Sequence, residues 1–358
     1  MDLMKKIKLL INLILILSLS MLSLNLFACK GYNTYDFLCF NSDVQVVVDK
    51  KLKDSIVNEI TSILFEIENS ISLDNNSSSI KALNDVSDND LVLLDEHSFY
   101  LLKQAKYCHA LTGGKFNPAV LPLLDLWKLS SSTYDANLSD YSPPSEQEIL
   151  SLLPICDFDN VVLNEELKLA NKLNPSTKIH FGASAKGYAV DKIKEILVRE
   201  NCNFGFINIG GSSVSVLDFS DGLYIRHPKN TSENIIKVNA DIIKNSPLST
   251  SGDYVKYYVD SLGKRYSHII DGNSGYPIST GFHSVTIIAN EASENKSACF
   301  TDMISTSLML TEKQEFIDFV NNNLRGFTVF AVYDDQIITN AGKNYYSILD
   351  SDYSLLEF

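Results

Sequence analysis

Apolar residues recur at helical spacing in the stretch that follows the first 50 residues. Those spaced three or four positions apart are Leu52, Ile56, Ile60, Ile63, Leu64 and Ile67. This spacing places them on one face and predicts a long amphipathic helix over residues 50–71. A second helix is predicted over residues 88–111, because the segment ends at Gly113-Gly114, as is typical of a helix C-terminus.

Short apolar runs rich in β-branched residues predict strands farther along the chain. They comprise residues 44–48, 161–163, 178–181, 206–209, 223–226 and 285–288. Further helices are predicted near residues 183–199 and 292–310, and Ser145 with Glu148 forms a capping-box pattern for a short helix. Strands and helices do not alternate regularly, which favours an α+β fold with mixed or antiparallel sheets.

Polar and aromatic residues are combined unusually in residues 249–278, STSGDYVKYYVDSLGKRYSHIIDGNSGYPI. Ser251-Gly252-Asp253 predicts a tight turn whose glycine lets a ligand approach the backbone closely. Three tyrosines begin a strand, Gly263 turns the chain, and residues 265–270 are predicted to form the returning strand. That strand would present His268 and Asp271 beside a second turn at residues 273–275.

A strand-to-helix turn near residues 180–187 is of the kind that receives anionic ligands. Lys186 would lie in its first helical turn, although the same pattern also suits a structural turn with a solvated lysine. On a later predicted helix, Asp302 and Thr306 share one face. Their oxygens suit magnesium, and a solvated pair on an ordinary helix is the alternative.

Trp127 and His268 each allow two interpretations. Trp127 is the only tryptophan and follows several leucines, which is typical of a core residue. A histidine within a strand is commonly held by a neighbouring carbonyl and inert, but His268 precedes Asp271 in the polar cluster.

The N-terminus has the pattern of a secretory leader. Lysines at positions 5, 6 and 8 precede an apolar run over residues 9–26, and Leu26-Phe27-Ala28-Cys29 resembles a bacterial lipobox. An uncleaved anchor is the alternative, since about 18 apolar residues can just span a bilayer. The lipobox favours cleavage of residues 1–28, a lipid on Cys29 and an extracytoplasmic body, on the periplasmic side, formed by residues 29–358.

Composition and charge narrow the classes of function. The 358 residues are 45% hydrophobic and 21% charged, as in an ordinary globular protein. The net charge of −14 argues against a nucleic-acid partner, and an anionic ligand would need a metal ion, a lysine or backbone amides. The six cysteines have no C-x-x-C spacing, so a zinc site or thioredoxin motif is not indicated and buried thiols are expected.

Residues 249–278 resemble the most distinctive signature of the ApbE family of flavin transferases. Five further segments match that family in order: residues 68–85 (ENSISLDNNSSSIKALND), 116–127 (FNPAVLPLLDLW), 180–193 (HFGASAKGYAVDKI), 207–217 (INIGGSSVSVL) and 301–310 (TDMISTSLML). The resemblance covers roughly the whole chain after the leader. It implies the ApbE-like α+β fold and a site for FAD.

The resemblance also implies roles for individual residues. A magnesium ion would be held by the Ala183 carbonyl and the side chains of Asp302 and Thr306. His268 would be the catalytic group, with Asp271 as the second candidate. Contacts to FAD are expected from Leu126, Trp127, Lys128, His180, Lys186, Ser251 and Gly252.

Four positions depart from the family's pattern. His180 stands where the family usually has an acidic contact to FAD. A methionine position falls near Cys39 and an aromatic position near Asp74, while Ser305 occupies a position that is acidic in some members.

The implied reaction is magnesium-dependent transfer of FMN from FAD to a threonine or serine hydroxyl of an acceptor protein, with release of AMP. The acceptor would be a flavoprotein subunit of a membrane redox complex, reached by a lipid-anchored enzyme. Two alternatives remain open: hydrolysis of FAD to FMN and AMP, and a non-catalytic lipoprotein that binds FAD.

Overall fold

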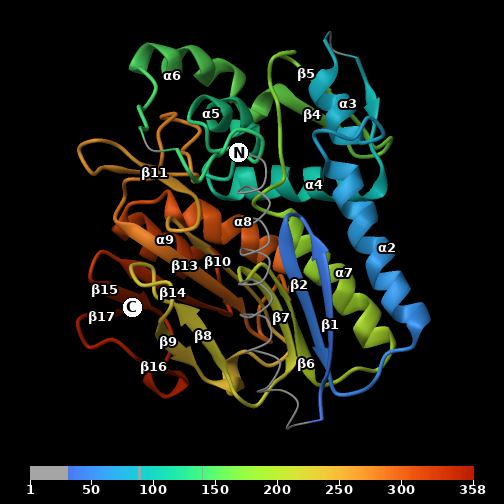
Figure 1. Cartoon of the computed structure of the whole chain (residues 1–358), viewed down its shortest axis with the longest axis vertical. Coiled ribbons are helices and arrows are strands. Elements are labelled where there is room, and N and C mark those ends of the chain that lie inside the picture. Colours follow the sequence, from blue (N-terminus) through green and yellow to red (C-terminus); the bar gives the residue numbers. More distant parts are fainter. Residues whose placement is uncertain (1–30, 88–89, 139) are drawn as a thin grey trace, which may run out of the picture.

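A nine-stranded sheet runs through the computed structural model, which describes residues 31–87, 90–138 and 140–358 (Figure 1). In spatial order its strands are β1 (Asn33–Cys39), β2 (Ser42–Val48), β6 (Gly205–Ile209), β7 (Ser213–Asp218), β10 (Pro247–Gly252), β13 (Phe282–Ala289), β14 (Phe327–Tyr333), β15 (Gln336–Thr339) and β17 (Ser354–Glu357). Neighbouring strands are antiparallel except β15 and β17, which are parallel. The predicted α+β class is therefore confirmed.

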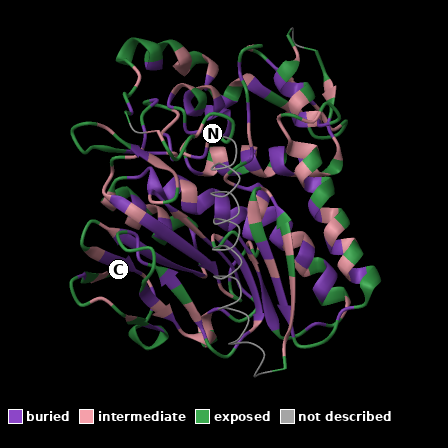
Figure 2. Cartoon of the chain, viewed as in Figure 1, coloured by how far each residue is buried: buried purple, intermediate pink, exposed green. Residues whose placement is uncertain are grey.

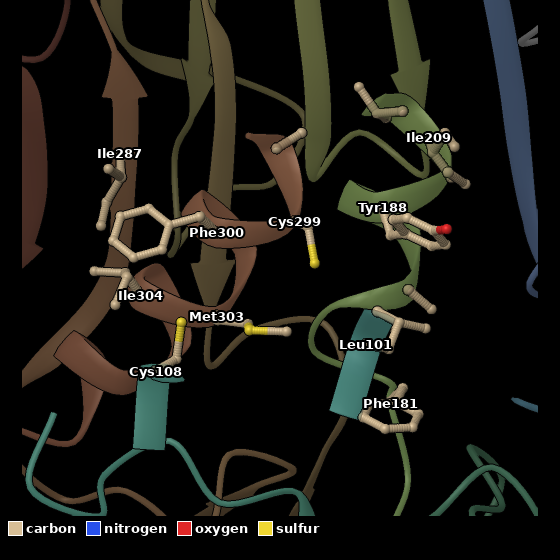
Figure 3. Packing of buried hydrophobic residues seen from close by; sticks show 14 of the residues in the cluster. Leu101, Cys108, Phe181, Tyr188, Ile209, Ile287, Cys299, Phe300, Met303 and Ile304 are labelled. Carbon is tan, nitrogen blue, oxygen red and sulfur yellow. The ribbon is translucent and has the colours of Figure 1, made fainter. Parts of the chain in front are cut away.

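Helices pack on one face of this sheet. They are α2 (Asp54–Ile71), α4 (Glu96–Leu111), α7 (Ala185–Arg199), α8 (Ala298–Met309) and α9 (Lys313–Asn323). Tyr188 of α7, Met303 of α8 and Leu101 of α4 belong to one buried cluster, as Figure 3 shows. This packing places the N-terminal half of α7 against α8.

The opposite face of the sheet is covered by a three-stranded sheet of β8 (Leu223–Arg226), β9 (Asn234–Val238) and β16 (Tyr346–Ile348). Val46 of β2 faces the helices while Val47 faces the small sheet, as alternation along a strand requires. Because both faces are covered, the central strands are almost wholly buried (Figure 2).

Smaller elements surround the end of the sheet where the site lies. They are α3 (Ser79–Asp85), α5 (Leu121–Leu126), α6 (Glu146–Leu152), β3 (Val92–Leu93), β4 (Val161–Asn164), β5 (Leu169–Lys172), the hairpin strands β11 (Tyr257–Val259) and β12 (Arg265–Ser267), and short 3₁₀ turns at Pro118–Val120, Leu153–Ile155 and Phe158–Asn160. Two further 3₁₀ turns, Ala240–Ile242 and Lys343–Tyr345, adjoin the three-stranded sheet instead.

Most predicted elements are confirmed, with shifted ends. The long helix begins at Asp54, and the capping box of Ser145 and Glu148 is present. The helix predicted over 88–111 begins only at Glu96, because the Asp95 carboxylate accepts from the amides of His97 and Ser98 and so caps it there.

Two local predictions are wrong. Residues 178–181 form no strand, because the Asn84 side chain binds both the amide and the carbonyl of Ile179, at 2.8 Å each. Ser251 and Gly252 are the last residues of β10, and the turn follows at residues 253–256. A Cβ on Gly252 would lie 2.4 Å from the Tyr254 ring, so this glycine makes room for the tyrosine.

The leader and Cys29 lie outside the described residues. Within the described ranges, no helix combines the length and the apolar character needed to cross a bilayer. The five described cysteines are free and buried, as expected: Cys39, Cys108, Cys156, Cys202 and Cys299.

Candidate active site

Asp302 lies at the junction of α7, α8 and β7. Its carboxylate accepts hydrogen bonds from the Gly187 amide, at 2.7 Å, and from the Ser213 hydroxyl, at 2.8 and 2.9 Å. A Cβ on Gly187 would lie 2.2 Å from the carbonyl oxygen of Ala298. Only glycine therefore lets the two helices approach this closely. Burial raises the pKa of the Asp302 carboxyl, and the nearby Lys186 cation opposes that rise.

The Ala183 carbonyl is left without a hydrogen bond in the described part of the chain. In a regular helix it would accept from the amide of Gly187, four residues later, but that amide donates to Asp302 instead. A free carbonyl oxygen at the start of α7 is thus available for a ligand, in keeping with the role that the resemblance implies.

Hydroxyl groups join the end of β10 to α8. The Ser251 hydroxyl lies 2.8 Å from that of Ser305 and 2.9 Å from that of Thr306. Thr306 also donates to the backbone carbonyl of Asp302, at 3.1 Å. The structure therefore brings together the predicted residues Asp302, Thr306 and Ser251.

Lys186 extends from α7 to the turn between β6 and β7. Its Nζ donates to the Ser212 hydroxyl at 2.7 Å. Gly210 and Gly211 in this turn have φ of 62° and 69°, a left-handed conformation that favours glycine. A cation and the Asp302 carboxylate thus lie on the same side of α7.

His268 follows β12 and is held by one backbone carbonyl. Its Nδ1 lies 3.1 Å from the carbonyl oxygen of Lys256. A carbonyl only accepts, so Nδ1 carries the proton and Nε2 presents a lone pair. Burial first, with the cations Lys256 and Lys186, lowers the pKa of His268 to about 4, so the ring is neutral at pH 7.

His180 has the opposite tautomer. Its Nδ1 accepts from the amide of Gly182 at 3.2 Å, so Nε2 carries the proton. Burial first, then His268 and Lys256, lowers the pKa of His180 to about 4. The two neutral rings therefore lie near each other. The Nε2–H of His180 can donate a hydrogen bond, and Nε2 of His268 can accept one.

Asp271 caps a turn in this structure. Its carboxylate accepts from the Asn273 amide at 3.0 Å, and its carbonyl accepts from Gly275 at 2.7 Å. No hydrogen bond between Asp271 and His268 is present among the described residues. The predicted second catalytic candidate is thus not joined to the first.

Trp127 is attached to the same turn. The indole Nε1 donates to the Gly275 carbonyl at 2.9 Å, and the ring is buried against Tyr266. Leu126 packs against this cluster, while Lys128 is exposed with φ of 58°. A contact between this tripeptide and FAD stays a prediction.

Sequence reasoning gave no role to several residues that shape the site. Ser213 lies in the family segment 207–217, outside the predicted strands, and Lys256 lies in the strand predicted to begin with the tyrosines, where a polar side chain gives no distinct signal. Asp191 was visible only as part of the family segment. Its carboxylate accepts from the amides of Ala298 and Cys299, at 2.7 and 3.0 Å, and so fixes the start of α8.

The oxygen atoms of the candidate ligands Ala183, Asp302 and Thr306 are of the type that magnesium prefers. They comprise one carboxylate, one hydroxyl and one free carbonyl, so a pyrophosphate and water would have to complete the coordination. The described residues contain no group of three or more histidines, cysteines or carboxylates that could hold a metal by themselves.

A cleft of about 570 Å³ lies between the end of α4, the Leu153–Asp159 segment and Gly272-Asn273. Neither Lys186, His268 nor Asp302 lines it. The cleft is therefore separate from the cluster around Asp302.

Comparisons with known proteins identify the family to which this chain is related. The ApbE family model matches residues 40–331, which is most of the chain. The FAD:protein FMN transferase of Klebsiella pneumoniae (strain 342) is 24% identical over 309 residues, covering 85% of this chain and 91% of that protein. The one of Treponema pallidum (strain Nichols) is 26% identical over 262 residues, covering 68% and 70%.

Solved structures share the fold. The ApbE protein of Thermotoga maritima is 29% identical with a TM-score of 0.70, covering 85% of this chain and 94% of that one. The flavin transferase ApbE of Vibrio cholerae is 18% identical with a TM-score of 0.71, covering 90% and 98%. The chain described here therefore belongs to the ApbE family.

Proposed function

We propose that this protein is a FAD:protein FMN transferase that moves FMN from FAD to a hydroxyl of an acceptor protein and releases AMP. The names of its relatives support this activity. The single observation that carries it is the lone pair on Nε2 of neutral His268, in the same electrostatic environment as Lys186. Asp302 in turn lies close enough to Lys186 for the cation to oppose the rise in its pKa.

In this reaction the acceptor hydroxyl oxygen attacks the FMN-side phosphorus of FAD. A P–O bond forms to the acceptor, and the P–O bond to the AMP phosphate breaks. His268 accepts the hydroxyl proton at Nε2. Lys186 compensates negative charge on the pyrophosphate, and the Nε2–H of His180 is available to donate to an oxygen of the substrate.

Magnesium fits the oxygen atoms present. Ala183 through its carbonyl, Asp302 and Thr306 would hold it, and it would supply positive charge at the pyrophosphate. The carboxylate keeps room for such an ion, because two oxygens offer about four lone-pair sites and three protein hydrogen bonds use part of them.

We further propose that the protein acts outside the cytoplasm, anchored through lipid on Cys29. The lipobox pattern supports this location. The acceptor would then be a flavoprotein subunit exposed on the same side of the membrane.

Incubation with FAD, magnesium and a threonine-bearing acceptor protein tests the activity. The transferase reaction gives AMP and an acceptor whose mass has increased by one FMN phosphoester. AMP and free FMN without that increase would identify a hydrolase instead. Bound FAD that is not turned over would identify a binding protein.

A further inference from the structure

Lys256 presents a cation that has no anionic partner within salt-bridge distance among the described residues. It lies between β10 and β11, half-buried, and its Nζ forms no hydrogen bond or salt bridge within the described part of the chain. The ammonium lies over the ring of Tyr134, whose centroid is 5.9 Å away. A partly desolvated cation without a counter-ion costs free energy, and this protein has a net charge of −14.

The backbone of Lys256 adjoins the catalytic candidate directly. Its carbonyl accepts from both the amide and Nδ1 of His268, at 3.0 and 3.1 Å. The charge on its side chain is near enough to lower the pKa of His180 and of His268. The neighbouring Lys186 cation is also close, since it lowers the pKa of Lys256 after burial does.

The positive charges of the two lysines are compensated differently by the protein. Lys186 is tied to Ser212 and lies near the Asp302 carboxylate. No carboxylate lies within salt-bridge distance of Lys256 among the described residues. Both cations therefore act on His268, and Asp253, the carboxylate that opposes them there, pairs with Arg265 and His283 and not with Lys256.

We propose that Lys256 is a second cationic residue that binds the pyrophosphate of the dinucleotide, together with Lys186. This inference rests on the proposed function, in which the substrate carries that group. A pyrophosphate would supply the missing counter-charge, and its hydrogen bonds to an ammonium are charge-assisted. Because His268 hydrogen-bonds to the backbone carbonyl of Lys256, the base would stay beside the phosphate group that the lysine side chain binds.

Lys264 provides a matched control on the same hairpin. It is exposed, and its ammonium lies over the Tyr266 ring at 5.1 Å. Lys264→Gln removes the same charge from the protein as Lys256→Gln does. A difference between the two variants therefore reports the position of the charge and not the net charge.

The test measures affinity for FAD and for riboflavin by flavin fluorescence, with EDTA present so that no metal contributes. Riboflavin carries the same ring system without phosphate. We expect Lys256→Gln to weaken FAD binding about tenfold, to leave riboflavin binding within about twofold, and to differ from Lys264→Gln, which stays near wild type. Lys256→Arg should recover most of the FAD affinity, since it restores the cation.

Equal FAD affinity of Lys256→Gln and Lys264→Gln would overturn the inference, as would an equal loss of riboflavin and FAD binding. If Lys256→Gln does not fold, Lys256→Met provides the same comparison with an apolar side chain. The proposed function fails in a different way: wild-type protein would then bind FAD but, with magnesium and an acceptor protein, release no AMP and modify no acceptor.

Discussion

At the scale of single residues, the two histidines of the site differ in what their Nε2 atom offers. His268 donates to a carbonyl and leaves an acceptor, whereas His180 accepts from an amide and leaves a donor. His180 replaces an acidic residue of the family, which could only accept. If this position contacts FAD, as the resemblance implies, it offers the substrate a donor in place of an acceptor.

Replacement of His268 by alanine should separate chemistry from binding. A group that accepts the hydroxyl proton acts chiefly in the transition state, so His268→Ala should lower turnover by about a hundredfold or more and change FAD affinity little. AMP release at saturating FAD and flavin fluorescence titration measure the two effects. Loss of affinity with an unchanged rate at saturation would make His268 a binding residue instead.

The pH dependence of the reaction should reflect the lowered pKa of His268. The base works in its neutral form, and burial lowers its pKa to about 4, so it stays neutral well below pH 6.5. We expect kcat/KM, which reports the free enzyme, to hold down to about pH 5 and to fall below it. A fall centred near pH 6.5 would show an ordinary histidine at this step.

At this scale, the sequence identifies residues with a recognisable chemical pattern more readily than it identifies which groups surround a residue in space. Asp302, Thr306 and Lys186 could be singled out, because a carboxylate and a hydroxyl on one helix face and a lysine at a helix start have recognisable patterns. Lys256 could not, because the role proposed for it rests on the absence, among the described residues, of a carboxylate within salt-bridge distance. Asp271 has the residue type of a catalytic group, but the structure uses it to cap a turn.

At the scale of elements, the contact between α7 and α8 sets the geometry of the site. Gly187 allows the close approach and gives its amide to Asp302, while Asp191 fixes the first turn of α8. Figure 3 shows Tyr188 of α7 and Cys299 of α8 in the same interior. The metal-ligand candidates on the two helices are therefore held by the same packing.

Gly187→Ala should damage both stability and activity. The new Cβ would meet the Ala298 carbonyl at 2.2 Å, and overpacking of this kind costs about 1–3 kcal/mol of unfolding free energy. AMP release should fall strongly, because Asp302 loses its hydrogen bond when the helices separate. Thermal unfolding and the AMP assay measure both effects.

Gly342→Ala is the control for this prediction. A Cβ at Gly342 would be 3.4 Å from its nearest neighbour, and its φ of −67° suits alanine. Its stability and activity should match wild type. Equal behaviour of the two variants would show that the closeness of α7 and α8 does not matter.

Elements that depend on local periodicity could be predicted from the sequence. A segment whose conformation is fixed by a residue far away in the sequence could not. The helix α2 follows from its apolar spacing, and α6 from its capping box. Residues 178–181 have a strand-like composition, yet Asn84 takes the backbone groups of Ile179, nearly a hundred residues away in sequence. No short stretch of sequence around residue 179 shows that Asn84 binds its backbone.

At the scale of the whole molecule, a net charge of −14 makes it necessary for the site to concentrate positive charge locally. Lys186 and Lys256, both near the neutral His268, provide it at one end of the sheet. The family and the α+β class could be predicted from ordered motifs alone. The positions of these charges relative to one another could not be predicted, because they depend on how β10, α7 and α8 pack.

The location of the protein is tested at Cys29. Mass analysis of the membrane-extracted protein should show a mature N-terminus at a lipidated Cys29, and detergent partitioning should recover it in the detergent phase. Cys29→Ser should carry no lipid, whereas Cys202→Ser should keep it. Wild-type protein with an intact leader on the membrane would contradict lipoprotein processing.

The most direct test of the proposed transfer is the ratio of its two products. Wild-type protein with FAD, magnesium and a threonine-bearing acceptor should release one AMP for each acceptor that gains an FMN group, and Asp302→Ala should lose both products. The exposed Asp318→Ala serves as the control and should behave as wild type. AMP release without any modified acceptor, or full activity of Asp302→Ala, would contradict the account.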